Sequence, residues 1–203
     1  MALTPIDIIA QPDVVALLGW PFDFELDAKL ADRAPDFTVA GNSTVEIIAR
    51  DGSDNSFALV GAPGDTSRPL LFVDHEASAG VIGRSLEEGL QIIVALPYWR
   101  DLLKFSGGQD LEEMRRSQTV FEEDFEDHVD LGEHFDLEEA RARIRSALAL
   151  APLADPVATL HANVGSFEDR FRVTFNEGDT CESLFGSAVY RPETGYRLDG
   201  GAV

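Results

Sequence analysis

Between residues 109 and 139 the chain concentrates its ionisable side chains, with aromatic residues placed among them. This segment holds thirteen acidic and two basic residues, so it carries −11 of the formal net charge of −21. Such a segment is either a solvated connector or a surface that attracts a basic partner. Disordered acidic segments are usually poor in aromatic residues, so the phenylalanines favour an ordered segment. The candidate partner-binding residues are Phe121, Glu122, Glu123, Asp124, Phe125, Glu126, Asp127 and Asp130.

The other reactive residues give weak support for metal or nucleophile chemistry. His128 and His134 lie among the acids, but their six-residue spacing matches neither an i, i+4 helical pair nor a zinc finger. The aspartates of the acidic segment are three residues apart, whereas a calcium loop places its ligands at alternate residues. Cys181 lies in an expected strand with no catalytic signature around it, which predicts a buried thiol. We therefore expect no metal site and no catalytic residue.

Three common enzyme signatures are absent from the sequence. There is no G-x-S-x-G motif, which places a nucleophilic serine on a strand–turn–helix elbow. There is also no G-x-x-x-x-G-K-[ST] loop to bind phosphates, and no G-x-G-x-x-G after a strand to bind a dinucleotide. The sequence thus predicts a protein that is not an enzyme and needs no cofactor.

The composition excludes several further classes of protein. Hydrophobic residues make up 44% of the 203 residues, which is enough to form a core. Sixteen basic residues against 37 acidic ones argue against binding nucleic acid or an anionic membrane, since both need clustered Lys and Arg. A single cysteine cannot form an internal disulfide. The N-terminus does not read as a signal peptide, and no apolar run approaches the ~20 residues of a membrane span, so we expect a cytoplasmic protein.

Hydrophobic periodicity predicts the elements that position these residues. Residues 85–96 open with S-x-x-E, a helix-capping signature, and carry Leu86, Leu90, Ile93 and Val94 on one helical face. Apolar and β-branched runs before this helix predict strands at residues 44–50, 56–61, 69–74 and 80–83. Further helices are expected within 5–19, at 98–103, from 110 toward 125, at 136–148 and at 155–163, followed by a hairpin of 170–175 with 180–185. Strands followed by helices indicate an α+β fold.

Two expectations concern individual side chains. Glu139 and Arg143 are spaced i, i+4 on the predicted helix 136–148, which favours an ion pair worth about 0.2–0.5 kcal/mol. Trp20, Pro21 and Phe22 form a short apolar cluster, which is more typical of core than of a binding site.

Residues 71–103, LFVDHEASAGVIGRSLEEGLQIIVALPYWRDLL, resemble the C-terminal part of the core of the SUKH superfamily, which includes Smi/Knr-type and Syd-like proteins. The resemblance lies in a strand, an acidic turn, a short strand and an S-L-x-E-x-L helix start. It implies a single α+β domain with a central sheet packed against helices. Many bacterial members are immunity proteins that neutralise toxins, often nucleases, and fungal relatives are scaffolds. The chain departs from the family pattern at Gly89, where a large apolar residue often lies, and it continues far beyond Gly108.

Together, these features predict one SUKH-type α+β domain with an antiparallel-rich sheet. Residues 1–108 form its core, and residues 109–203 form an acidic helical extension with a terminal hairpin packed on it. The favoured function is non-enzymatic protein binding, as an immunity protein against a basic toxin. In that interface Phe121 and Phe125 are either apolar anchors or packing residues of the extension. The alternatives are a scaffold or regulator without a toxin partner, and a hydrolase with an acidic metal site.

Overall fold

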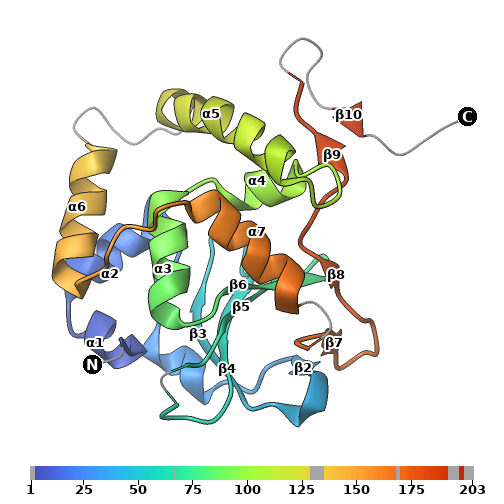
Figure 1. Ribbon diagram of the computed structural model, residues 1–203. Helices are drawn as coiled ribbons and strands as arrows, with labels where there is room; N and C mark the ends of the chain where they lie inside the picture. Colours follow the sequence, from blue (N-terminus) through green and yellow to red (C-terminus); the bar gives the residue numbers. More distant parts are fainter. Residues whose placement is uncertain (1–2, 66, 129–134, 168–169, 192–196, 199–203) are drawn as a thin grey trace, which may run out of the picture.

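The computed structural model describes residues 3–65, 67–128, 135–167, 170–191 and 197–198 (Figure 1). In this part of the chain seven helices pack with a mostly antiparallel six-stranded sheet, which confirms the predicted α+β class. Figure 1 shows most helices on one side of the sheet, with α3 near the centre of that layer. The helices are α1 (Pro5–Ile9), α2 (Pro12–Gly19), α3 (Leu86–Ala95), α4 (Trp99–Lys104), α5 (Leu111–His128), α6 (Leu137–Leu148) and α7 (Pro156–Phe167).

The sheet is built on the four strands that the sequence predicts. Their order is that of the chain, and each pairs antiparallel with the next. A two-residue strand extends the sheet at each edge, and the one after β6 runs parallel to it. From edge to edge the strands are β1 (Glu25–Leu26), β3 (Val45–Arg50), β4 (Ser56–Val60), β5 (Leu70–Val73), β6 (Ser78–Gly83) and β8 (Glu182–Ser183).

Both faces of this sheet are buried. Side chains alternate between faces along a strand, so Phe57 and Phe72 join the core beneath the helices, while Ala58 and Leu71 join a smaller core on the opposite face. Every residue of β4 and β5 is consequently buried. This explains why their sequences read as continuous apolar runs rather than as alternating ones.

Helix α3 forms as its sequence predicts. Ser85 is its N-cap, and the Ser85 hydroxyl accepts a hydrogen bond from the backbone N–H of Glu88 at 3.1 Å. The predicted apolar face is buried throughout, because Leu86 is 4% exposed and Leu90, Ile93 and Val94 are fully buried.

The opposite face of the sheet is covered by a strand pair that the sequence did not predict. β2 (Phe37–Val39) pairs antiparallel with β7 (Val173–Phe175), and the short 3-10 helix η1 (Ala28–Asp32) adds Leu30 to the same small core. A second 3-10 helix, η2 (Ala40–Asn42), follows β2, and β9 (Ala188–Val189) pairs with β10 (Arg197–Leu198) near the end of the chain.

The predicted hairpin of residues 170–175 with 180–185 forms only around its turn. Cys181 donates a backbone hydrogen bond to Val173, and Thr174 bridges Thr180. Beyond Cys181 the two segments separate, because β7 pairs with β2 while β8 pairs with β6. Each segment thus completes a different layer of the fold.

Residues after 108 contribute to the same core as those before it. Helix α7 packs on α3 and β6, and its Leu160 and Val164 are buried there. Helix α6 packs on α3 and α2, and Ile144 is its fully buried contact residue. The acidic helix α5 packs on α4 and α7, so it is held against the main body of the domain.

Candidate functional site

Helix α5 has an aromatic side that faces the protein. The ring of Phe121 lies 5.6 Å from that of Phe105 and 5.5 Å from that of Tyr190, measured between centroids. Phe125 lies 6.0 Å from the ring of Tyr98. Both phenylalanines are half-buried against the main core. They anchor α5 to the domain and fix which side of the helix faces outward.

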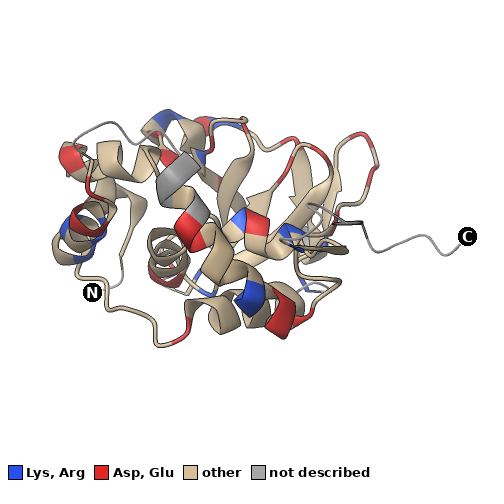
Figure 2. Ribbon diagram, turned by 90° about the horizontal axis from the view of Figure 1, so that it is seen from above, with Lys and Arg blue, Asp and Glu red and all other residues tan. Residues whose placement is uncertain are grey.

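Two acids in the second half of α5 are described at side-chain level, and both are open to solvent. Glu122 and Glu123 are exposed. Figure 2, which looks at the molecule from above, marks acidic positions in red along the helices. Asp124, Glu126 and Asp127 lie on the same helix, although their side chains are not among those described, and Asp130 lies outside the described residues.

The two arginines of α5 do not neutralise Glu122 and Glu123. Arg115 pairs with Glu112 and Asp155, each at 2.8 Å. Arg116 pairs with Glu113 at 2.5 Å. These pairs hold both cations in the first half of the helix, so the second half keeps its negative potential.

The pKa of Tyr98, which lies beneath α5, is changed by burial and by the charge of that helix. Its hydroxyl is buried, and the side chain of Gln118 offsets a small part of the effect of that burial on its pKa. Burial first, and then the negative charge of Glu122, raise the pKa of Tyr98 to about 12. The carboxylate of Glu122 is therefore close enough to act on the core beneath the helix.

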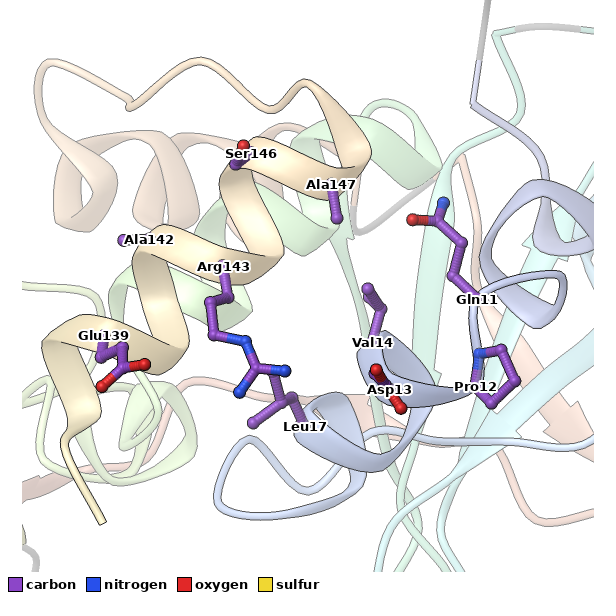
Figure 3. Close-up of a pocket in the computed structure, with 10 residues that line it drawn as sticks. All are labelled: Gln11, Pro12, Asp13, Val14, Leu17, Glu139, Ala142, Arg143, Ser146 and Ala147. Carbon is purple, nitrogen blue, oxygen red and sulfur yellow. The ribbon is translucent and has the colours of Figure 1, made fainter. Parts of the chain in front are cut away.

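A groove separates α2 from α6 (Figure 3). It has a volume of about 610 Å³ and is lined by ten residues, which belong to the two helices and to the residue before α2.

Two sequence-based expectations prove wrong at these helices. Arg143 does not pair with Glu139 but extends toward Leu17 across the groove. Trp20, expected in the core, is 52% exposed at the end of α2, whereas Pro21 and Phe22 of the same cluster are buried.

A second cleft of about 680 Å³ lies where β5, β6, β8 and α4 meet. Asp101 lines it between Arg100 and Lys104. Asp101 is exposed to solvent, but the protein atoms around it partly desolvate its carboxyl and raise its pKa. The charges of Lys104 and Arg100 lower this pKa, but by less than desolvation raises it. The cleft thus holds one carboxyl with an altered pKa. Sequence inspection did not find it, because its lining comes from three separate stretches of the chain, within 72–78, 99–104 and 182–187.

The residues considered for nucleophile and metal chemistry lie apart. Cys181 is half-buried, and burial followed by the charge of Asp74 raises the pKa of its thiol to about 11. His75 binds Asn55 at 2.6 Å, and His161 lies 2.9 Å from the carbonyl of Gln109. The side chains of the acidic-segment histidines are not described. Within the described residues, no three His, Cys, Asp or Glu side chains group in a way that would hold a metal ion.

Comparisons with known proteins return no match to a family model, a curated protein or a solved structure. Within the described part of the chain, none of the helices combines the length and apolar character needed to cross a membrane.

Proposed function

We propose that this chain is a non-enzymatic binding protein that uses the exposed carboxylates of α5 to recognise a basic partner protein. Glu122 and Glu123 form this acidic α5 surface. The observation that carries the proposal is the division of α5 into two sides. Phe121 and Phe125 pack inward, whereas the carboxylates of Glu122 and Glu123 on the same helix face solvent.

Electrostatics explains why such a surface suits a basic partner. A formal net charge of −21 attracts a cationic protein from a distance and speeds its association. At ~0.15 M ionic strength the Debye length is ~8 Å, so exposed carboxylates act strongly only on groups that dock beside them. The partner must therefore place Lys or Arg side chains directly against α5.

The proposed partner is a toxin that the chain neutralises. The sequence resemblance of residues 71–103 to SUKH proteins supports this, because many of those proteins are immunity proteins. A nuclease is a suitable basic toxin, since its nucleic-acid groove is lined with cations that acidic side chains can occupy. If the chain instead binds a basic protein without toxic activity, it is a scaffold or regulator.

A pair of charge-matched variants tests the surface. Glu122→Gln with Glu123→Gln removes two charges from α5 while preserving side-chain shape. Glu177→Gln with Asp179→Asn removes two exposed charges from the turn after β7. Wild type and both variants are used to capture partners from the native cell, and bound proteins are identified by mass spectrometry.

Association rates with the captured protein are then measured at several salt concentrations. We expect the α5 variant to associate more slowly, with a flatter salt dependence, while the turn variant behaves like wild type. Equal association rates for the two variants would exclude α5 as the interface. Expression of the captured protein with and without this chain distinguishes a neutralised toxin from another partner.

A further inference from the structure

The groove between α2 and α6 is an open trough between two antiparallel helices. Figure 3 shows the start of α6, at Glu139, beside the Leu17 end of α2, and the end of α6, at Ala147, beside Gln11. Val14 at its base is buried, whereas Ala142 and Ala147 on its wall are exposed. Small-molecule sites usually enclose most of their ligand. A groove with exposed walls is instead suited to an elongated ligand.

An exposed tryptophan follows α2, the helix that forms one side of this groove. Trp20 follows α2 directly, and its backbone N–H bonds to Ala16 at 3.3 Å. At 52% exposure it is one of two large hydrophobic residues that the described chain leaves exposed, and the other is Ile6 on the neighbouring helix α1. Tryptophan is enriched among residues that dominate binding energy at protein interfaces. It comes three residues after Leu17, which lines the groove.

The charged side chains of the groove are unpaired. In the described part of the chain, the side chains of Asp13, Glu139 and Arg143 form no ion pair or hydrogen bond, although all three residues line the groove. Two carboxylates against one guanidinium leave the groove acidic. The groove therefore combines an apolar floor with a negatively charged rim, a pattern complementary to a helix whose apolar face is bordered by Lys or Arg.

These features select one class of occupant. A second copy of the chain is disfavoured, because each copy carries a formal net charge of −21 and the two would repel. A basic helix is attracted by the same charge. The lining of α6 extends from Glu139 to Ala147, which is about 12 Å of helix and matches roughly two turns of a docked helix.

We propose that the α2–α6 groove binds a basic amphipathic helix of a partner protein. The apolar face of that helix packs on Leu17, Ala142 and Ala147 and on Trp20 after the end of α2, and its basic residues pair with Asp13 and Glu139. This site is separate from the acidic α5 surface, so either can exist without the other.

A synthetic peptide of about 14 residues tests the proposal, since it spans nearly four helical turns. Its leucines are placed on one helical face and its lysines on the other, and a control peptide has the same composition in scrambled order. Trp20 is the reporter, because the other tryptophan, Trp99, is only 3% exposed. We expect the patterned peptide to shift tryptophan emission to shorter wavelength and to protect it from acrylamide quenching. The scrambled peptide should do neither.

Matched alanine-to-arginine variants locate the binding site. Ala142→Arg places a bulky cation inside the groove, whereas Ala162→Arg makes the same change at an exposed position of α7. We expect the first variant to weaken binding of the patterned peptide at least about tenfold and the second to change it by less than about twofold. Ser146→Arg obstructs the groove one turn further along α6 and replaces the first variant if that one unfolds.

No saturable binding by the patterned peptide would overturn the proposal. Equal binding of the two peptides, or equal weakening by the groove and α7 variants, would also overturn it, because net charge alone would then attract the peptide. Weakening by Glu122→Gln with Glu123→Gln, without any effect of Ala142→Arg, would place the peptide on α5 and exclude the groove. None of these outcomes decides whether a native partner binds the acidic α5 surface, which the capture experiment tests independently.

Discussion

Gly89 of α3 lies directly against Leu70 of β5, so closely that a β-carbon at Gly89 would be 2.4 Å from Leu70 Cδ2. Gly89 also lies against Gly83 of β6. A β-carbon on Gly83 would be 2.3 Å from the backbone nitrogen of Gly89. This contact gives a physical reason for glycine at this position of α3. Leu70 is fully buried and cannot move aside freely.

The close contact predicts that alanine at this position destabilises the protein. Within a helix, Gly→Ala usually gains up to about 1 kcal/mol from helix propensity. Overpacking a core costs about 1–3 kcal/mol, and here it outweighs that gain. We expect Gly89→Ala to lower the free energy of unfolding by about 1–2 kcal/mol in urea denaturation.

A second glycine provides the control. In α7, a β-carbon at Gly165 would meet only Phe185, at an ordinary distance of 3.8 Å. Gly165→Ala should therefore stabilise the protein by about 0.5–1 kcal/mol. If both variants were stabilised equally, α3 would not approach the sheet as closely as described.

Ile93 tests the predicted apolar face of α3. It is fully buried in the main core, so Ile93→Ala should cost about 2–5 kcal/mol of unfolding free energy through lost burial and the cavity left behind. Ile6→Ala is the matched control, because Ile6 is also helical but 77% exposed. We expect the control to change stability by less than about 0.5 kcal/mol. A loss below that value for Ile93 would contradict the packing of α3 on the sheet.

The elements that the sequence predicted are those with strong local signals. The Ser85 cap and the spacing of Leu90 and Ile93 mark α3 without reference to the rest of the chain. The pairing of β2 with β7 has no such signal. Each strand has only three residues, and the register joins Phe37 to Phe175 across most of the chain. Pairing over such a separation depends on tertiary packing rather than on local pattern.

The same distinction applies to the candidate sites. The acidic segment was visible in the sequence because charge is a local property. The exposure of Trp20 was not, since an apolar residue next to Pro21 and Phe22 usually indicates core. The orientation of Arg143 depends on α2, which lies more than a hundred residues earlier in the chain, so its i, i+4 neighbour Glu139 could not determine it.

Glu88 predicts a pH dependence of stability. Burial raises the pKa of its carboxyl, but hydrogen bonds from Arg84 and Asn163, each 2.7 Å at the shortest, outweigh this effect and lower the pKa below 4.5. A lowered pKa in the folded state stabilises the protein above the unfolded-state value, and that stability is lost as pH falls through the folded-state pKa. Glu88→Gln should therefore cost about 1–2 kcal/mol at pH 7.

The stability difference between wild type and Glu88→Gln should shrink as pH falls below 4.5 and vanish below the lowered pKa. Glu87→Gln removes a charge from the adjacent, exposed position and should change stability by less than about 0.5 kcal/mol. A stability difference that stays constant from pH 7 to pH 3 would mean that the ionised carboxylate of Glu88 is not the stabilising form.

Cys181 gives a prediction about reactivity. With a pKa of about 11, only about one thiol in a thousand is ionised at pH 8, whereas an ordinary thiol of pKa ~8.5 is ionised at roughly one in four. Because the thiolate is the reacting species, iodoacetamide should alkylate the folded protein about 200-fold more slowly than the protein unfolded in guanidinium. Asp74→Asn should raise the rate only modestly, since burial is the larger cause of the shift. Rapid alkylation of the folded protein at pH 8 would contradict this prediction, because it would show that the folded protein stabilises the thiolate. Cys181 would then be a candidate catalytic nucleophile.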